Sequence, residues 1–397
     1  MKISFFNYHY FTEGSSRGAA AQLRSMAEWL ERLGHEVDLQ FRWTADKAGD
    51  APSSDQQRGM RRVKWLRRYA HVPRRLWRNR RFLREEKRYL RESRPDVLLA
   101  VNSFCYDSAL RAARKTGTPF VLYCEAPLEY EYALFHSQFY TYPRLSRRIE
   151  RKNVTGADQV ICVSEILKGY LVHFGAPATR LHVVPNGVDH QRFKPGPKDA
   201  EIVSRYRLEG KTVVGFIGSF NFFADVESFA DGLKTLCDRH PEAAFLFVGK
   251  GLAGEQIEAA AAKRGLQERL IFTGAVPHEE VTRYLSVMDA VINPYRGDYL
   301  FYGSSLKLLE YMAAGKPALV TALGQIKELV QDGYNGMLFD WGDDETMLRK
   351  LSLLIEDGEL RRRLGKNARK TIEADWTWEK QAAKIAGVLQ LAIESRR

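Results

Sequence analysis

Residues 293–320 read NPYRGDYLFYGSSLKLLEYMAAGKPALV, and the fold that we expect for the chain follows from this stretch. It begins where the apolar run Val291-Ile292 ends, and such a run is typical of a buried strand. Small residues at 303–305 then lead into helical spacing over 306–314, which Gly315 ends. A loop that feeds a helix leaves backbone N–H groups unpaired at the helix N-terminus, where the helix dipole favours an anion. The stretch therefore predicts a strand, a phosphate-binding loop, a helix and a further strand.

Two charged residues on the expected helix narrow this prediction. Lys307 and Glu310 are three positions apart, so they share one face of the helix. A cation in the first turn opposes the helix dipole unless an anion compensates it, and a bound diphosphate would do so. The carboxylate one turn later could accept two hydrogen bonds from a ribose diol. A solvated ion pair between the two side chains is the alternative, and their spacing does not separate the two interpretations.

Apolar runs of strand length alternate with segments of helical spacing along the chain. We expect one series of strands at 2–7, 36–41, 96–101, 119–124, 159–163 and 182–184, and a second series at 212–217, 244–248, 270–272, 290–293, 318–321 and 337–339. The alternation predicts an α/β protein with two doubly wound parallel sheets, in which ligands bind at the carboxyl ends of the strands. A linker at 194–197 separates the two series, so we place an N-terminal domain at 1–190 and a C-terminal domain at 195–377.

The composition is that of a soluble globular protein, with 45% hydrophobic and 28% charged residues. The cysteines are widely spaced in or beside apolar segments, which predicts reduced core residues rather than a metal site or a disulfide framework; they are Cys105, Cys124, Cys162 and Cys237. The first residues lack the features of a signal peptide, and no apolar window approaches the roughly 18 residues of a membrane span. We therefore expect a cytoplasmic protein without a membrane span.

The positive charge of the chain is concentrated in residues 58–94. This segment holds 16 Lys or Arg residues against three acidic ones, so it carries +13, whereas the remainder carries −1. Pro73 is expected to divide it into two helices, and Trp65, Trp77 and Phe82 lie among the arginines. The pattern is typical of an interfacial amphipathic helix on an anionic membrane. One alternative is a helix pair that packs its leucines on the sheet and leaves the arginines in solvent. Nucleic acid is not expected as a partner, because no recognisable motif for it accompanies the charge.

The segment GSSLKLLEYMAAGKP at 303–317 resembles the donor-binding motif of the retaining nucleotide-sugar glycosyltransferases of GT-B fold, the family 4-like group 1. Further stretches are similar to the same family: ADQVICVSE at 157–165, VPNGVD at 184–189, FKP at 193–195 and GAVPHE at 274–279. In that family a ribose-binding Glu follows a first Glu by eight positions. Glu310 matches the second of these positions, whereas Tyr302 stands at the first and departs from the pattern.

The resemblance implies a specific architecture and a donor site. Two Rossmann-like domains are expected to face a cleft, with a last helix at 378–397 packed back on the first domain. The donor site is expected in the C-terminal domain. Its residues would be Gly218, Ser219, Lys250, Val276, Pro277, Tyr302, Gly303, Ser304, Ser305, Leu306, Lys307 and Glu310.

Two cations of the family pattern are missing. The usual Arg and Lys after the first strand of the second domain fall on Ser219 and Ala224. In the family the reaction needs no metal, because protein cations and helix N–H groups stabilise the departing diphosphate. Lys307 is the best replacement for the missing cations, aided by Lys250 or Arg17. We therefore expect Lys307 to be catalytic.

Acceptor-side residues are expected in the first domain. The histidine that the family carries there falls on Glu125. A carboxylate at this position could orient the acceptor hydroxyl or take its proton, and Glu129 and Glu131 are nearby alternatives. The loop after the first strand adds Gly14 and Arg17. The glycine spacing of that loop is not that of a dinucleotide-binding motif, so no nicotinamide cofactor is expected.

The resemblance implies a transferase that moves a sugar, with retention, from a nucleoside diphosphate sugar to an acceptor hydroxyl. The expected acceptor is a lipid-linked or polysaccharide intermediate at the inner face of a membrane. No cofactor and no metal are expected, and no Asp-x-Asp motif occurs. Two alternatives stay open. One is a non-catalytic protein of degenerate transferase fold that binds a nucleotide sugar or a partner at a membrane, and the other is a nucleotide-sugar epimerase.

Overall fold

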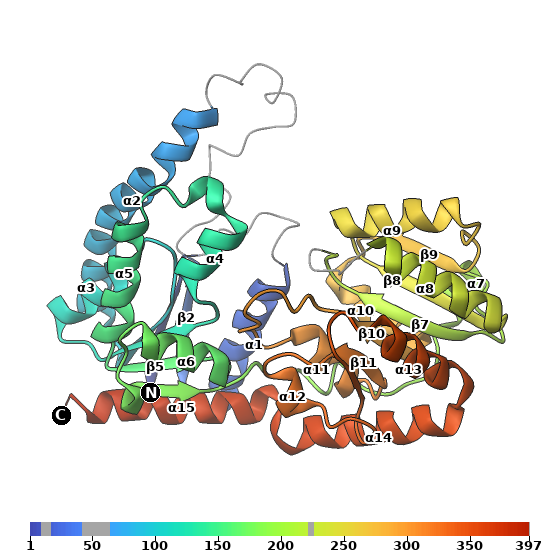
Figure 1. Ribbon diagram of the computed structural model, residues 1–397. Helices are drawn as coiled ribbons and strands as arrows, with labels where there is room; N and C mark the ends of the chain where they lie inside the picture. Colours follow the sequence, from blue (N-terminus) through green and yellow to red (C-terminus); the bar gives the residue numbers. More distant parts are fainter. Residues whose placement is uncertain (9–16, 42–63, 221–225, 397) are drawn as a thin grey trace. The chain divides into compact units, whose positions relative to one another are not determined.

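The chain divides into two compact units (Figure 1). The first contains Met1–Pro185 and Gln381–Arg397, and the second contains Asn186–Lys380. The computed structural model describes residues 1–8, 17–41, 64–220 and 226–396, with the backbone alone at 17–19, 64–68 and 226–228. The sequence-based prediction placed these boundaries at 190 and 378.

A parallel sheet of six strands, in the order β2-β1-β3-β4-β5-β6, forms the centre of the first unit. Its strands are β1 (Lys2–Asn7), β2 (Glu36–Phe41), β3 (Val97–Val101), β4 (Phe120–Cys124), β5 (Gln159–Cys162) and β6 (Leu181–Val183). These confirm the first expected series, with small shifts at the strand ends. The strands β3 and β4 are buried at every position, as in parallel sheets that are covered on both faces.

The helices of the first unit alternate with its strands. They are α1 (Arg17–Arg32), α2 (Lys64–Ser93), α3 (Ser108–Thr116), α4 (Leu128–Phe135), α5 (Pro143–Gly156), α6 (Glu165–His173) and α15 (Trp378–Glu394), with short 3₁₀ turns η3 (Ser137–Phe139) and η4 (Ala178–Arg180). The last helix, α15, belongs to this unit from Gln381 onward. Near its end, the Arg396 guanidinium forms an ion pair with Asp158 at 2.9 Å.

Two of these helices, α4 and α5, are absent from the sequence-based prediction. The first N–H groups of α4, at Leu128 and Glu129, donate to the two carboxylate oxygens of Glu150 in α5, at 3.0 and 2.8 Å. The residue before α4 is Pro127, which has no side-chain cap. Because the capping group comes from another helix, the local sequence carries no start signal. Burial raises the pKa of Glu150 to about 8, against the effect of the two N–H donors.

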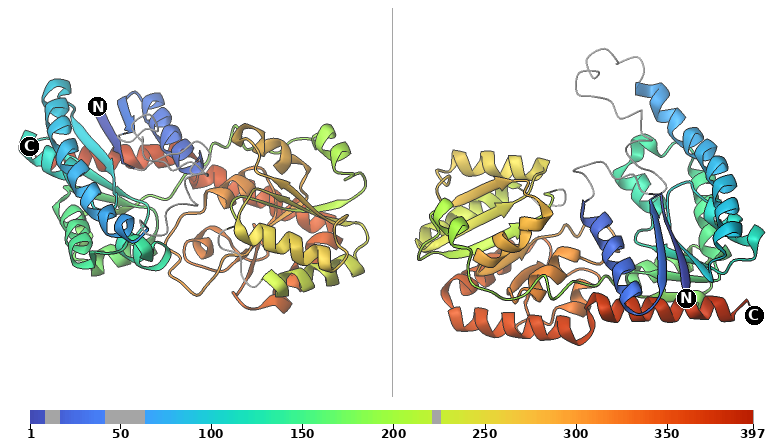
Figure 2. Two further views of the ribbon diagram at one scale, coloured as in Figure 1. Left: turned by 90° about the horizontal axis from the view of Figure 1, so that it is seen from above. Right: turned by 180° about the vertical axis from the view of Figure 1, so that it is seen from behind.

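Helix α2 runs through Pro73 without a break, so the expected division into two helices is wrong. A proline inside a helix removes a backbone hydrogen bond and costs about 3 kcal/mol. Packing on both sides of the proline offsets this cost. Val72 is buried in a cluster with Phe104 and Leu128, and Leu76 packs against the same cluster. The helix also lies beside α3 (Figure 2).

The second unit contains the sheet β12-β11-β10-β7-β8-β9, which is also parallel. Its strands are β7 (Thr212–Ile217), β8 (Ala243–Val248), β9 (Leu270–Gly274), β10 (Ala290–Asn293), β11 (Ala318–Thr321) and β12 (Met337–Phe339), which confirms the second expected series. The chain builds the sheet outward from β7 through β8 to β9 and then returns to the other side of β7 with β10. The carboxyl ends of β7 and β10 are therefore the switch point at which ligands bind in such sheets.

Helices cover both faces of the second sheet. They are α7 (Ala200–Arg205), α8 (Val226–Arg239), α9 (Leu252–Lys263), α10 (Val281–Val287), α11 (Leu306–Ala313), α12 (Ile326–Leu329), α13 (Asp344–Glu356) and α14 (Gly358–Asp375), with the 3₁₀ turn η5 (His278–Glu280). One apolar cluster joins β7 to α11 and α14 and includes Val213, Leu309 and Ile372. A second cluster on the other face joins β7 to α8 and α13 and includes Val214 and Leu351.

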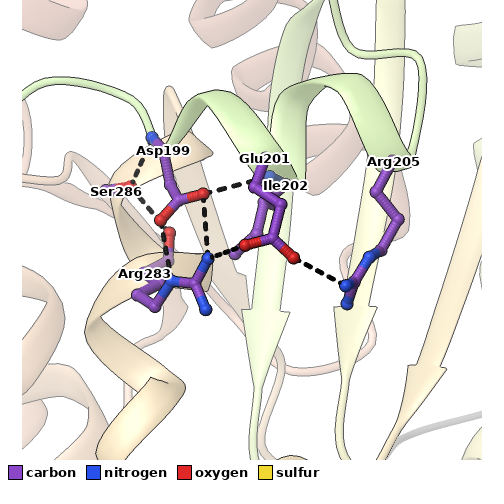
Figure 3. Close-up of polar contacts among 6 residues, drawn as sticks. All are labelled: Asp199, Glu201, Ile202, Arg205, Arg283 and Ser286. Atoms are coloured by element: carbon purple, nitrogen blue, oxygen red, sulfur yellow. Dashed lines mark hydrogen bonds and ion pairs between the residues drawn. The ribbon is translucent and has the colours of Figure 1, made fainter.

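A charged network ties α7 to α10 at the start of the second unit (Figure 3). The Asp199 carboxylate caps the N-terminus of α7 and accepts hydrogen bonds from Arg283 at 2.7 and 3.3 Å. The Arg283 guanidinium also pairs with Glu201 at 2.6 Å, and Glu201 pairs with Arg205 at 2.7 Å. The Asp199 N–H donates to the Ser286 hydroxyl at 3.1 Å. Most of these groups are half-exposed, so we regard the network as a local tie rather than as a functional site.

Candidate active site

The residues expected to bind the donor lie at the carboxyl edge of the second sheet. Gly218 and Ser219 follow β7, Lys250 follows β8, and the 275–280 loop follows β9. The loop that ends in 302–305 follows β10 and leads into α11. Parallel strands bring their carboxyl ends to one edge, which is why segments so far apart in the sequence meet there.

The 303–305 turn is held by its own two hydroxyl groups. Ser305 caps α11, because its Oγ accepts a hydrogen bond from the Leu308 N–H at 3.3 Å, and the same oxygen lies 2.7 Å from the Tyr295 hydroxyl. The Ser304 Oγ accepts from the Asn186 N–H at 3.1 Å. Among the described residues, the backbone N–H groups of Gly303, Ser304 and Ser305 have no hydrogen-bond partner. A Cβ atom at Gly303 would meet no atom within 4 Å, so the turn is open at this position.

The Lys307 ammonium group extends over the end of β7. Its Nζ lies 4.7 Å from the centre of the Phe216 ring and 5.6 Å from that of Tyr295. A Cβ atom at Gly218 would lie 2.9 Å from this Nζ, and the φ angle of Gly218 is +147°. Only glycine leaves room for the cation at this place. Burial lowers the pKa of Lys307 to about 8, and the nearby Glu310 carboxylate opposes that shift.

The Glu310 carboxyl group lies one turn further along α11 and is half-buried. Burial raises its pKa to about 7, whereas Arg192 and then Lys307 act to lower it. Among the described residues, no ion pair within 4.0 Å joins Glu310 to Lys307. The solvated ion pair that the spacing allowed is therefore wrong. The two charged groups share a face of α11 and act on each other electrostatically without forming an ion pair.

The remaining donor-side candidates are more peripheral. Ser219 and Lys250 are exposed, and the Lys250 Cε lies 3.4 Å from the place of a Cβ at Gly274. Val276 packs partly into the core, while Pro277 is exposed before η5. Tyr302 and Leu306 are half-buried at the carboxyl edge of the second sheet. Ala224 lies outside the described residues.

Two residues near the site escaped the sequence-based prediction. Arg192 donates from its Nη2 to the His278 carbonyl oxygen at 2.7 Å, and Asn186 donates twice to Ser304. Both residues belong to the stretch from VPNGVD to FKP. Its similarity to the family was the only feature of the sequence that could have pointed to them. The contacts join positions 86 and 118 residues apart, which no local pattern reveals.

Glu125 is the acceptor-side candidate whose surroundings fit acid–base chemistry best. It follows β4, and its Oε1 accepts a hydrogen bond from the Gln22 side chain at 2.8 Å. Burial raises its pKa to about 7, with a smaller contribution from Glu131. The Glu129 carboxylate instead accepts from the Tyr140 hydroxyl at 2.6 Å. Gly14 and the Arg17 side chain lie outside the described residues.

The basic helix α2 shows two different faces. Trp77 is 64% exposed, and it shares its face with Arg74, Arg81, Arg84, Arg88 and Arg91, all of which are exposed. Phe82 faces inward, where its ring packs against Tyr8 and Tyr106 with centroid distances of 5.8 and 5.7 Å. The expectation that Phe82 enters a membrane is therefore wrong, because its ring packs against two buried tyrosines of the same unit. The Trp65 side chain lies outside the described residues.

Three further properties bear on the site. All four cysteines are buried and free, as expected. Among the described residues, no group of three or more His, Cys, Asp or Glu side chains is placed to hold a metal ion. Within the same part of the chain, no helix is long and apolar enough to cross a bilayer.

Comparison with known proteins gives matches over both units. The family described as Glycosyltransferase Family 4 matches residues 16–192, and that described as Glycosyl transferases group 1 matches residues 198–371. A GDP-mannose-dependent alpha-(1-6)-phosphatidylinositol monomannoside mannosyltransferase of Mycobacterium tuberculosis is 27% identical over 250 residues, a match that covers 62% of this chain and 65% of that protein. The match thus spans less than two thirds of the relative's length.

Solved structures resemble the whole chain. Sucrose-phosphate synthase from Thermosynechococcus elongatus superposes with a TM-score of 0.72 at 18% identity and covers 99% of each chain. HepE from Anabaena, in complex with UDP-glucose, gives a TM-score of 0.68 at 18% identity and covers 98% of this chain and 99% of that one. At such identities the likeness establishes the GT-B fold alone. Together with the two family matches, it shows that the chain belongs to the group 1, family 4-like glycosyltransferases.

Proposed function

We propose that the protein transfers a sugar, with retention of anomeric configuration, from a nucleoside diphosphate sugar to an acceptor hydroxyl. The observation that carries the proposal is the place of the Lys307 ammonium group. It lies over the carboxyl end of β7, against Gly218 and beside the N-terminus of α11. This is where a phosphate group would meet a cation and unpaired N–H groups at the same time.

Charge on the leaving diphosphate grows as the glycosidic bond breaks, so a cation and aligned N–H groups stabilise the transition state more than the ground state. Lys307 and the 303–305 N–H groups would act in this way, without a metal ion. The anion would itself favour the protonated form of Lys307. Glu310, one turn away on α11, would accept hydrogen bonds from the ribose diol.

On the acceptor side, we assign the acceptor hydroxyl to Glu125. A carboxyl group with a pKa of about 7 can take a proton at neutral pH more effectively than an ordinary glutamate. Gln22 holds one of its oxygens, at 2.8 Å, and thereby orients the group. Glu129 is a weaker choice, because Tyr140 already occupies its Oε1.

We further propose a glycan or lipid-linked acceptor that is reached from an anionic membrane surface on the cytoplasmic side. Two observations support this proposal. The exposed face of α2 combines arginines with Trp77, as interfacial helices do. In addition, the mycobacterial relative is named for a phosphatidylinositol monomannoside substrate.

The test is transfer from a panel of UDP- and GDP-sugars to lipid-linked and soluble glycan acceptors, with the anomeric configuration of the product read by NMR. Transfer with inversion would overturn the retaining assignment. A donor that binds but is neither transferred nor hydrolysed would favour the non-catalytic alternative. We include this alternative in the test because the exposed Ser219 stands where the family has a cation.

A further inference from the structure

The segment 186–193, which reads NGVDHQRF, has so far no part in the proposed chemistry. We propose that this segment is a structural part of the donor site. It positions the phosphate-binding turn through Asn186 and, through Arg192, the 275–280 loop, which resembles the nucleobase-contact loop of the family. The inference rests on the proposed function, since it concerns the same site. It assigns two positioning residues to that site.

Asn186 controls the phosphate end. Its backbone N–H donates to the Ser304 Oγ at 3.1 Å, and its side-chain Nδ2 donates to the Ser304 carbonyl oxygen at 3.0 Å. Both the side chain and the carbonyl group of Ser304 are thereby fixed. The orientation of the two adjoining peptide groups follows, including the unpaired N–H groups of Ser304 and Ser305. Asn186 is only 6% exposed, so water does not compete strongly for these bonds.

Arg192 controls the nucleoside end. Its Nη2 donates to the His278 carbonyl oxygen at 2.7 Å, which ties the loop after β9 to the segment. The guanidinium lies over the Phe193 ring, with its Cζ 5.3 Å from the centroid. Arg192 also exerts a larger electrostatic effect on Glu310 than Lys307 does, although no ion pair within 4.0 Å joins them among the described residues. Arg192 therefore contacts the 275–280 loop directly and acts electrostatically on the carboxylate that we assign to the ribose.

The segment itself is anchored from α14 and from the chain that follows it. Val188 exchanges backbone hydrogen bonds with Trp376 and Trp378, at 3.0 and 3.2 Å. The Arg369 Nη1 donates to the carbonyl oxygens of His190 and Phe193, and to Ala313 at the end of α11, at 2.8, 2.9 and 2.8 Å. One guanidinium thus binds the segment and the helix that carries Glu310. Asn186 and Arg192 therefore extend from a fixed base.

This arrangement predicts that the two residues act on different parts of the nucleotide. Asn186→Ala should weaken the binding of a nucleoside diphosphate at least tenfold and change the binding of the nucleoside less than twofold. Arg192→Ala should weaken the nucleoside, the monophosphate and the diphosphate by a similar factor, at least fivefold. Ser304→Ala, which removes the partner hydroxyl, should reproduce the pattern of Asn186→Ala in weaker form.

Matched controls separate positioning from general stability. Asn335 is also buried in the second unit, and its Nδ2 donates to the Leu329 carbonyl and the Thr371 hydroxyl, both at 3.0 Å. Asn335→Ala should lower the melting temperature and leave all nucleotide affinities unchanged. For Arg192 the control is Arg205, which pairs with Glu201 on α7. Arg205→Ala should change neither property.

A pH profile gives a readout that loss of packing alone would not move. Glu310 must be ionised to accept hydrogen bonds from a diol, so affinity should fall as pH decreases through its pKa. The charged groups that act on it are Arg192 and Lys307, and both lower its pKa. Removing Arg192 should therefore move this acidic limb to higher pH. Arg192→Lys keeps the positive charge but lacks the several N–H donors of a guanidinium. It should therefore return the acidic limb of the pH profile nearly to its wild-type position without restoring the affinity.

The experiment is calorimetric titration of the full chain and each variant with uridine, UMP and UDP, and with guanosine, GMP and GDP. We expect the split between Asn186 and Arg192 described above in whichever series the wild type binds. If the wild type binds the diphosphate and both variants lose affinity equally across the series, or lose none, the inference is overturned and the proposed function stands. If the wild type binds neither UDP nor GDP, the proposed function is overturned together with the inference.

Discussion

At the scale of single residues, the site depends on two charged groups that are held apart on one helix. Lys307 reaches the end of β7 because Gly218 leaves space there, and Glu310 remains half-buried without Lys307 as an ion-pair partner. Burial moves both pKa values toward neutrality, to about 8 and about 7. Groups with perturbed pKa values at the switch point of a parallel sheet are typical of a functional site.

Substitution of Glu310 by alanine should remove most donor affinity and leave the fold intact. Two hydrogen bonds from a ribose diol to a charged group contribute about 1.5–3 kcal/mol each, so the loss should be about 3 kcal/mol or more. Calorimetric titration with the donor measures it, and circular dichroism checks the fold. An unchanged dissociation constant would reject the ribose assignment.

Substitution of Lys307 by alanine should lower turnover more than donor affinity, because the diphosphate gains charge as the bond breaks. Steady-state kinetics with the donor identified from the panel provide the measurement. Lys316 is a suitable control, since its ammonium group donates to the Ser286 and Met288 carbonyl oxygens at 3.0 and 2.7 Å and so holds the end of α10. If Lys307→Ala retains turnover and only weakens binding, another cation serves the leaving group.

Donor affinity should follow a bell-shaped pH profile. Glu310 must be ionised, so affinity should rise with pH through about 7, and Lys307 must be protonated, so affinity should fall above about 8. The two groups interact, and the apparent values therefore belong to the pair. Glu310→Gln should remove the acidic limb and Lys307→Gln the alkaline limb. A flat wild-type profile from about one pH unit below the pKa of Glu310 to about one unit above that of Lys307 would contradict the assignment of both groups.

At the scale of elements, α2 combines a packing face and a charged face in one continuous helix. Its inward side carries polar groups as well as leucines: Asn79 bonds with Asp107 at 2.6 Å, and Glu86 accepts from the Tyr8 hydroxyl at 2.7 Å. Its outward side carries the arginines and Trp77. The helix-pair alternative thus describes the inward face correctly, and the outward face remains available for an anionic surface.

Replacing Arg81, Arg84 and Arg88 together by glutamine should abolish most binding to phosphatidylglycerol vesicles. Each basic residue near an anionic surface contributes about 1 kcal/mol, so the three together should change the partition coefficient by roughly a hundredfold. Vesicle co-sedimentation at low salt measures it, and added salt should release the wild type.

The matched control for this experiment is the triple substitution of Arg362, Arg363 and Lys366 by glutamine, since these residues are exposed on α14. This variant should bind vesicles as the wild type does. Equal binding of the wild type to phosphatidylglycerol and phosphatidylcholine, or binding to neither, would reject the membrane proposal.

At the scale of the whole molecule, the chain forms two parallel sheets, and each has its own switch point. All of the donor-side contacts that we describe lie within 186–380, whereas Glu125 lies in the first unit. The second unit by itself therefore carries every group that we assign to the nucleotide: the phosphate turn, the Lys307 cation, the Glu310 carboxylate and the segment 186–193.

Binding of a nucleoside diphosphate should therefore protect amide groups mainly in the second unit. At a ligand concentration of about 100 times Kd, the bound state gains about 2.7 kcal/mol relative to the unfolded state. Hydrogen exchange with UDP or GDP should slow at 186–193, 274–280 and 302–310, with little change in β2 and β3. Inorganic phosphate at equal ionic strength is the control. Protection confined to the first unit would contradict the placement of the donor site.

The sequence by itself determined the strands, the two sheets and the helix that carries Lys307 and Glu310, because each depends on local periodicity and on turn chemistry within a few residues. It did not reveal α4, whose cap comes from Glu150, nor the unbroken course of α2 through Pro73, which distant packing stabilises. Only the tertiary structure showed that Lys307 and Glu310 form no ion pair. It also showed that Asn186 contacts Ser304 and that Arg192 contacts the His278 carbonyl group. These features depend on burial and on hydrogen bonds between positions far apart in the chain, and a local pattern cannot encode which distant groups will meet.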